Sequence, residues 1–537
     1  MKARFRKDRS QLLKLNDRSL VYNESIIRKL KLEQRLLRLF ASRHFFTVVV
    51  ILFVFESVWI SVSAVYPQAF DEQFHFGLIQ IYSHYLLPFL SHQPAHADAY
   101  GAVARDPSYL YHYLMSFPYR VVSVFTSDQT IQIICLRLIN VCFGVVTLIL
   151  SRKILIKVGL SKTFANLASA IYALIPIVPQ LSGQLNYDNL LLPLGAAVIL
   201  LTIRAIEEIT AGKPRLKTLI FLISLCFITV LVQYEFLAIF AAIWLFLIYI
   251  SFRKFKPPGK LWRLLKADWQ RLGRLWKWAL LASFIISFGL FFQRDGINLV
   301  QYHTLNPECS RVLSIKSCDN YNVWQSSYSW HASVVNHTTA NIKLTNPVAY
   351  TGEWIYWLWY RLFFAVNGPV SGYTNYPPLP LPVAAAALLG VVGVVLVVVK
   401  IRSFKSKPVL QFFILAALLY LAFLWADGYM QYKYTHVLVL MNGRYVLPVI
   451  FLMAAVIGSA LTSFFKNIPK LKLLAATVIL LLFLEGGGLL TFVVRSDASW
   501  DWPSSFVVKM NNDARKVIWP VVFEGPKTYT TTVWRFN

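Results

Sequence analysis

The 537-residue sequence is poor in charge for its length, because only 15% of its residues are Asp, Glu, Lys or Arg. A soluble globular chain carries about a quarter of such residues. Apolar residues make up 57% of this chain, and its mean hydropathy is +0.54. The composition excludes an ordinary soluble protein and favours a chain whose main solvent is lipid.

Acidic residues are scarce, with 25 Asp and Glu against 53 Lys and Arg. Such an excess often indicates nucleic-acid binding, but here the basic residues gather in alternate segments between apolar runs. That pattern is typical of a membrane protein and requires no nucleic-acid partner. Adjacent glycines occur only from Gly486 to Gly488, inside an apolar stretch, so a Walker-type phosphate-binding loop is absent.

Cysteines number only five, and no Cys/His spacing resembles a zinc site. Cys135, Cys142 and Cys226 fall in apolar runs, where thiols serve as packing residues. Cys309 and Cys318 share one polar segment. On the topology derived below, this segment faces an oxidising compartment, and the sequence predicts a short disulfide loop there.

Long apolar runs dominate the chain, and a helix of about 20 such residues crosses a bilayer. We expect eleven spans, several of them near the lower limit of length. Their approximate bounds are 46–66, 131–150, 163–180, 189–206, 217–233, 236–252, 278–293, 379–399, 409–426, 445–465 and 473–494.

The distribution of basic residues predicts the orientation, because cytoplasmic loops carry the Lys and Arg excess. With the N-terminus inside, 37 of these residues fall in inside segments and 15 in outside segments. We therefore expect a multi-pass membrane protein with a cytoplasmic N-terminus and an outer C-terminus. Its predicted parts are a cytoplasmic basic amphipathic segment (1–45), a transmembrane domain (46–494) with outer loops 67–130 and 294–378, and an outer tail (495–537).

Two adjacent carboxylates, Asp71 and Glu72, follow the first span, and His75 comes one turn later. Charges at the outer edge of a membrane are costly to desolvate, which makes them functional candidates. An ionised carboxylate can accept a proton from an attacking hydroxyl. The alternative is that both acids only cap the helix that follows them.

This stretch, Phe70-Asp71-Glu72 followed by His75-Phe76-Gly77, resembles the first outer loop of protein O-mannosyltransferases and related GT-C membrane glycosyltransferases. Members of that superfamily take a sugar from a polyprenyl-phosphate carrier, with an acidic residue of this loop as the base. The resemblance implies that Asp71 is the catalytic base and that Glu72 is its catalytic partner.

Further matches follow in the same order along the chain. The loop at Asp106 is similar to a His-Pro-Pro-Leu-Tyr-Tyr sequence of the family but lacks its histidine and one proline, and Asn442 stands where a Gln-Gly-Arg-Tyr motif of bacterial members has glutamine. The matching segments are Asp106-Pro107-Ser108-Tyr109-Leu110-Tyr111, Cys135-Leu136-Arg137-Leu138-Ile139-Asn140, Asn186-Tyr187-Asp188-Asn189 and Asn442-Gly443-Arg444-Tyr445-Val446-Leu447-Pro448. The bacterial motif favours a plasma membrane.

A leaving polyprenyl phosphate needs its charge met at the membrane surface. Arg444 and Arg137 are the leading cations for this purpose. Alternatively, Arg444 reaches the interface as an ordinary surface arginine, and Arg137 forms a structural pair with a carboxylate such as Glu56. Asp188 either supports the site or caps a helix. The predicted substrate-binding residues are His75, Asp106, Arg137, Asp188, Arg444 and Tyr445.

The sequence therefore predicts an all-α polytopic membrane protein of GT-C type, with about 11 transmembrane helices and an active site formed by outer loops. We expect it to transfer a hexosyl or pentosyl group with inversion from a polyprenyl-phosphate carrier to a glycan, lipid or protein hydroxyl. The reaction requires no cofactor, although the carboxylates allow a divalent metal. The alternatives are a non-catalytic scaffold and a transporter or flippase, in which buried charges such as Glu56, Glu235 and Glu485 mark a transport path.

Overall fold

The fold is all-helical in the computed structural model, which describes residues 34–90, 92–257, 259–321, 346–363, 380–435, 440–464 and 498–518, with scattered positions between 474 and 496. No β-strand occurs in these ranges, and extended segments meet only at one antiparallel bridge between Ala64 and Asp501. The predicted basic segment 1–45 and outer tail 495–537 lie partly outside the described residues.

Among the residues that the structure describes, eight helices are long and apolar enough to cross a membrane, which confirms a multi-pass helical protein. They run through α2 (Arg43–Ser63), α5 (Gln129–Lys157), α8 (Asp188–Thr210), η3 and α10 (Tyr234–Lys254), α12 to α13 (Arg274–Tyr302), α18 (Pro380–Lys400, with Ala387–Phe404 the apolar window), α19 (Pro408–Thr435), and η6 and α20 (Gly443–Phe464).

The predicted count of eleven spans is not confirmed. The run 163–180 is broken into α6 (Lys162–Leu174) and α7 (Ile177–Ser182), because Pro176 cannot donate a hydrogen bond within a continuing helix. The run 217–233 forms α9 (Leu216–Val230), which has only 15 residues. Most of the run 473–494, with Glu485, lies outside the described residues.

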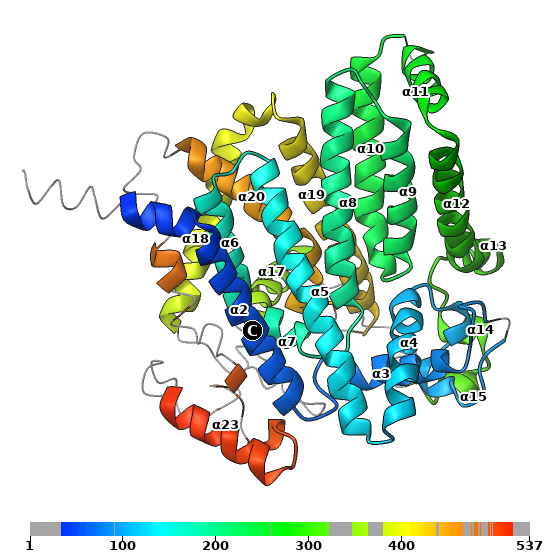
Figure 1. The fold of residues 1–537 in the computed structure, drawn as a ribbon, viewed down its shortest axis with the longest axis vertical. Coiled ribbons are helices and arrows are strands. Elements are labelled where there is room, and N and C mark those ends of the chain that lie inside the picture. Colours follow the sequence, from blue (N-terminus) through cyan, green and yellow to red (C-terminus); the bar gives the residue numbers. More distant parts are fainter. Residues whose placement is uncertain are drawn as a thin grey trace, which may run out of the picture.

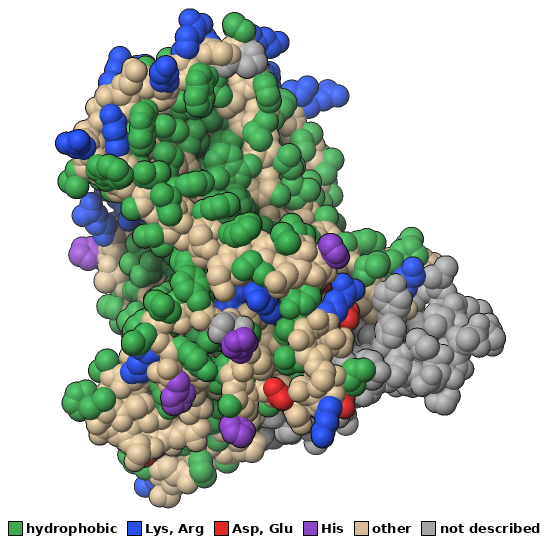
Figure 2. Space-filling view, turned by 90° about the vertical axis from the view of Figure 1, so that its right-hand side faces the viewer, with side chains coloured by type: hydrophobic (Ala, Val, Ile, Leu, Met, Phe, Trp, Pro, Cys, Tyr) green, Lys and Arg blue, Asp and Glu red, His purple; other side chains and the backbone are tan. Residues whose placement is uncertain are grey.

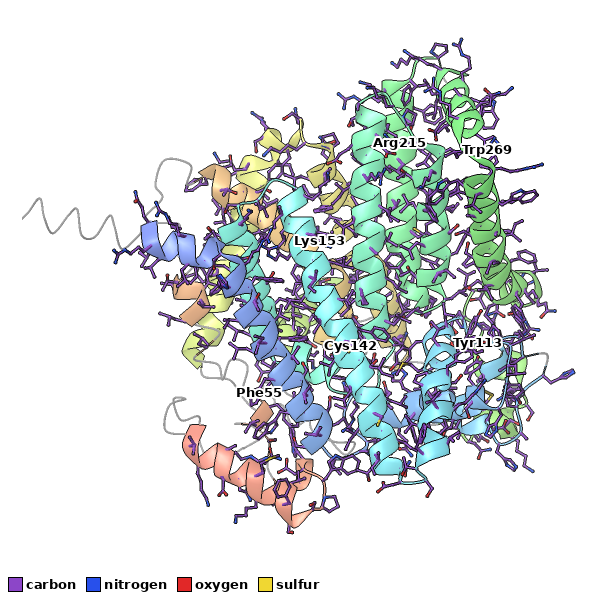
Figure 3. All side chains as sticks on the ribbon, in the orientation of Figure 1. Phe55, Tyr113, Cys142, Lys153, Arg215 and Trp269 are labelled. Carbon is purple, nitrogen blue, oxygen red and sulfur yellow. A yellow bond between two sulfur atoms is a disulfide. The ribbon has the colours of Figure 1, made fainter. Side chains whose placement is uncertain are left out.

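The two ends of the bundle differ in structure (Figure 1). One end carries α11 (Gly259–Arg271), with Lys153, Arg215 and Trp269 nearby (Figure 3). The other end carries α3 (Glu72–Ser83), α4 (Leu110–Phe125), α14 (Cys309–Val312), α15 (Ile315–Cys318) and α23 (Ser505–Ile518). We call this second end the loop end.

Charge is also divided between these ends. Figure 2 shows many Lys and Arg side chains at the end opposite the loop end and others scattered over the lower half, whereas the acidic side chains visible on that face lie toward the loop end. The two regions are separated by a wide band of hydrophobic side chains over the helices. This arrangement suits helices that stand in a bilayer with their charged ends in water.

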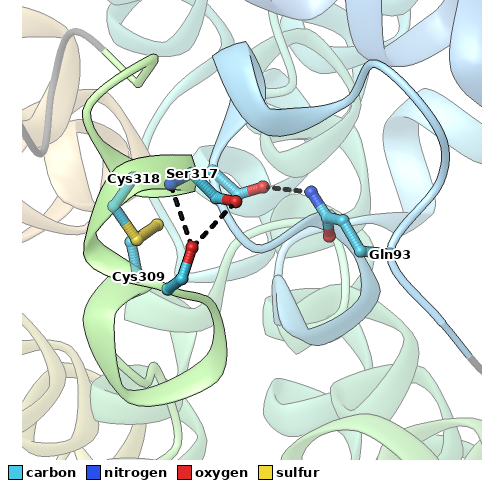
Figure 4. Close-up of a disulfide and its surroundings, with 6 residues drawn as sticks. Gln93, Cys309, Ser317 and Cys318 are labelled. Atoms are coloured by element: carbon cyan, nitrogen blue, oxygen red, sulfur yellow. Dashed lines mark hydrogen bonds between the residues drawn. A yellow bond between two sulfur atoms is a disulfide. The ribbon is translucent and has the colours of Figure 1, made fainter.

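Short helices of the loop end pack around a disulfide. Cys309 and Cys318 are joined, which confirms the predicted disulfide, and α15 packs against η1 (Asp98–Tyr100) (Figure 4). A π-helical turn at η4 (Phe292–Gly296) leads from α12 into this region. Its residue Arg294 is fully buried and donates to the carbonyls of Pro88, Val103 and Ala104. Segments far apart in sequence are thereby fixed together.

Candidate active site

Asp71 lies at the start of α3, in an unusual backbone conformation. Its φ is +65° and that of Phe70 is +64°, a left-handed region that non-glycine residues seldom adopt. The Asp71 side chain remains 61% exposed at the loop end. Its carboxylate makes no capping hydrogen bond to α3, so the capping alternative is not what the structure shows for this residue.

The carbonyl of Phe70 holds this conformation in place. It accepts a hydrogen bond from Nδ2 of Asn186 at 3.0 Å and one from Nη1 of Arg444 at 3.3 Å. Oδ1 of Asn186 in turn accepts from the backbone N–H of Asp188 at 2.9 Å. The loop before α8 and the turn before α20 therefore fix the backbone that presents Asp71.

Arg444 lies between two carboxylates. Its Nη2 is 3.3 Å from Oδ2 of Asp71, and its Nε is 3.8 Å from Oδ2 of Asp188. Both Arg444 and Asp188 are buried, yet Nε of the arginine and Oδ2 of the aspartate make no hydrogen bond within the described part of the chain. Arg444 is therefore attracted to both acids without being fully satisfied by either.

Aromatic rings surround this arginine. Its guanidinium lies 5.3 Å from the centroid of the Phe70 ring and 5.1 Å from that of Tyr445. Nη2 also donates to the Tyr445 hydroxyl at 3.3 Å. Such rings stabilise a desolvated cation. The distances also show that four of the predicted residues, Arg444, Tyr445, Asp71 and Asp188, lie together.

Glu72 faces the opposite way from Asp71 and is fully buried. It accepts from Nε of Arg137 at 2.8 Å and from Nη2 at 2.6 Å, a bidentate ion pair. The same carboxylate accepts from the backbone N–H groups of Gln68 and Leu185. With every acceptor position occupied and no access to solvent, Glu72 serves as an anchor for the start of α3.

Arg137 is likewise fully buried, and its remaining donors reach the carbonyls of Ser61 and Ala64. Of the two expectations for this residue, the structure shows the structural pair. The expected partner Glu56 is wrong, because the partner is Glu72. A phosphate contact by Arg137 would require breaking this network.

His75 belongs to a buried pair of histidines. Its Nε2 lies 3.1 Å from Nδ2 of Asn186, which can only donate, and its Nδ1 lies 2.8 Å from Nε2 of His112. This network assigns the His75 proton to Nδ1. Burial lowers the pKa of both residues, that of His112 to about 3, and the charge of Arg444 lowers the pKa of His75 further. Both rings are therefore neutral at pH 7 and link α3, α4 and the loop at Asn186.

Asp106 lies farther along the loop end. Its Oδ1 accepts from the backbone N–H of Ser108 at 2.9 Å, which closes a local turn. Burial raises the pKa of Asp106, and the nearby Arg294 opposes that rise. No ion pair joins Asp106 to a cation in the described ranges. Asp106 therefore takes no part in the ion pairs of Arg444.

Several residues at the site had no sequence signal strong enough to single them out. His112 and Asn186 were visible only as polar residues inside or beside matching segments, and Glu235 only as a charge in an apolar run. No group of three or more His, Cys, Asp or Glu that could hold a metal occurs among the residues that the structure describes.

The sequence matches no family model and no curated protein in comparisons with both.

Proposed function

We propose that this protein is a membrane glycosyltransferase of GT-C type that moves a sugar from a polyprenyl-phosphate carrier to an acceptor hydroxyl at the loop end. One observation carries the proposal: an exposed carboxylate, Asp71, is held in a rare backbone conformation at the end of a membrane bundle, beside a buried cation. Strained backbone of this kind persists where surrounding contacts enforce it, and it clusters at functional sites.

The proposed reaction is a single displacement. A carboxylate oxygen of Asp71 takes the proton from the acceptor hydroxyl, whose oxygen attacks the anomeric carbon of the carried sugar. The bond between that carbon and the phosphate oxygen breaks, and its electron pair leaves with the polyprenyl phosphate. The anomeric carbon is inverted, and no oxidation or reduction takes place.

Arg444 is the cation best placed to meet the phosphate charge. Its contacts to Asp71 and Asp188 are loose, at 3.3 Å and 3.8 Å, and its Nε makes no hydrogen bond among the described residues. An arriving phosphate could therefore take up an unused donor without breaking a tight pair. Arg137 serves this purpose poorly, because its donors are already engaged in a closed network.

The charge distribution supports placing the loop end on the non-cytoplasmic side. Many Lys and Arg side chains lie at the opposite end, as the positive-inside rule requires of cytoplasmic loops (Figure 2). The disulfide between Cys309 and Cys318 at the loop end suits an oxidising compartment. We propose a plasma membrane location with the N-terminus in the cytoplasm and the C-terminus outside.

The test uses purified full-length protein, a panel of radiolabelled polyprenyl-phosphate hexoses and pentoses, and a measurement of label released from the lipid. Asp71→Asn keeps the size of the side chain and removes the base, so we expect the rate to fall by about 10²–10⁴-fold. Glu308→Gln is the matched control, because Glu308 is an exposed acid at the same end. Normal transfer by Asp71→Asn would rule out the base, whereas a transporter or scaffold would release no sugar in any variant.

A further inference from the structure

Three aromatic rings from separate segments meet beside Asp71. Phe74 lies one turn into α3, and its ring is 6.0 Å from that of Tyr321, with an interplanar angle of 29°. Tyr100, at the end of η1, lies 5.9 Å from Phe74 on a tilted plane. All three side chains are half-buried, so the cluster keeps part of its surface open to solvent. We call these three residues the aromatic platform.

Tyr321 is fitted closely to the first outer loop. Gly101 has a φ of +74°, and a Cβ at that position would come within 2.9 Å of the Tyr321 ring. The Gly101 carbonyl accepts from Nε2 of Gln93 at 2.7 Å, beside the hairpin closed by the disulfide (Figure 4). Glycine therefore suits this position for two reasons: it adopts the positive φ without strain, and it leaves room for the Tyr321 ring.

The backbone behind the platform is held from η4 and α13 (Ile297–Tyr302). Arg294 donates to carbonyls at Val103 and Ala104, and Asn298 donates to the carbonyls of Arg105 and Leu305 at 2.8 Å and 2.9 Å. The bonds to Val103, Ala104 and Arg105 cross from one outer loop to the other. The platform is therefore assembled before any ligand arrives, which lowers the entropic cost of binding.

Hydrogen-bonding groups border the platform. Burial raises the pKa of the Tyr321 phenol, and the negative charges of Asp106 and Asp71 raise it further. Within the described ranges, Oδ2 of Asp106 accepts no hydrogen bond, and Nη1 of Arg105 donates none. The loop that carries Tyr100 thus also carries an unused acceptor and an unused donor.

This combination fits one class of ligand better than others. A sugar ring presents a face of C–H groups that packs on an aromatic ring, and its edge carries hydroxyls that donate to carboxylates. A lipid chain has no donors for Asp106, whereas a saccharide has several.

We propose that the aromatic platform and Asp106 bind a sugar ring of the acceptor, so that the hydroxyl that Asp71 deprotonates belongs to a carbohydrate. The role of Asp71 in this statement rests on the function proposed above, whereas the binding of a saccharide does not. Phe74 follows Asp71 by three residues at the start of α3, so one short segment carries both a ring of the platform and the proposed base.

Binding is tested without turnover, with the Asp71→Asn protein in detergent and cellobiose, maltose and mannobiose as probes. We expect saturation-transfer NMR to show contact with at least one disaccharide, and Tyr321→Ala to weaken it by about 3–10-fold, the worth of one aromatic contact. Tyr321→Trp, which keeps a ring, should restore it. Tyr302→Ala is the matched control, because Tyr302 lies in the same outer loop and, among the described residues, forms a side-chain-mediated hydrogen bond only through its carbonyl, to Arg311.

Transfer then provides the second measurement. In otherwise unaltered protein we expect Tyr321→Ala to raise the KM for a saccharide acceptor by about 3–10-fold, while hydrolysis of the donor by water stays within twofold. An unchanged KM, or transfer to hydroxyl peptides but to no saccharide, would overturn the platform. Saccharide binding lost in Tyr321→Ala, in a protein that turns over no donor, would support the platform and overturn the proposed function.

Discussion

Two buried arginines at the loop end form ion pairs of contrasting quality. Arg137 makes a bidentate pair with Glu72 at 2.6 Å and 2.8 Å, and both side chains are fully inaccessible to solvent. Arg444 approaches Asp71 and Asp188 only to 3.3 Å and 3.8 Å, and one of these acids is 61% exposed. The first network is closed, whereas the second leaves a donor and an acceptor unsatisfied.

The difference shows that two adjacent acids can have separate roles, one in stability and one at the surface. Glu72 and Asp71 are adjacent in sequence, yet one holds α3 to α5 from within and the other faces outward. A closed network resists rearrangement, because breaking it leaves an uncompensated buried charge. An incomplete network can accept a ligand at low cost. We therefore expect the first arginine to control stability and the second to control activity.

The largest expected effect comes from breaking the closed pair. Arg137→Met leaves Glu72 buried without its cation, and we expect the free energy of unfolding to fall by about 3–5 kcal/mol. Thermal or denaturant unfolding of the purified protein in detergent measures this. The double variant Glu72→Leu/Arg137→Met removes both charges and should recover most of the loss. A single variant within about 1 kcal/mol of the original protein would remove the distinction between the two arginines.

The second arginine should show the opposite pattern. Arg444→Met removes a charged hydrogen-bond donor worth about 1.5–3 kcal/mol, so we expect sugar transfer to slow by about 10–100-fold. Its effect on unfolding should be smaller than that of Arg137→Met, since its ion pairs are long and one partner is exposed. Arg444→Lys should keep part of the activity. Equal losses of stability in the two methionine variants would contradict the comparison.

The histidine pair offers a smaller test, by pH. The pKa of His112 is lowered from 6.5 to about 3 in the folded protein, so its stabilising effect is fully present above pH 6.5. As the pH falls below 6.5, His112 becomes protonated in the unfolded chain but stays neutral in the folded protein. This difference lowers the free energy of unfolding by about 2 kcal/mol at pH 5. His112→Gln should reduce this slope between pH 7 and pH 5. An unchanged slope would show that other groups cause it.

The sequence predicted the parts of the structure that depend on local composition. The apolar runs placed the eight long helices, and two cysteines nine residues apart correctly indicated a disulfide. The break at Pro176 was missed because a hydropathy window averages over a proline. The number of spans was also overestimated where an apolar run was short, as in α9.

The site was predicted only in part, because its pairings are long-range. Arg137 and Glu72 are 65 residues apart, and Arg444 and Asp71 are 373 residues apart, so no local pattern specifies either contact. Glu56 was a reasonable partner for Arg137 by depth in the membrane, yet the pair forms with Glu72, the first residue of α3. Tyr321 carried no signal, because its position depends on the glycine that receives it.

The bridge between Ala64 and Asp501 has a consequence for the order in which the chain matures. Trp502, beside it, lies 5.7 Å from the guanidinium of Arg137, so the residues around 500 cover a contact between helices made hundreds of residues earlier. During synthesis, Trp502 can shield that ion pair only after most of the bundle has entered the membrane. Indole fluorescence from Trp502 would then mark the moment at which the nascent protein closes.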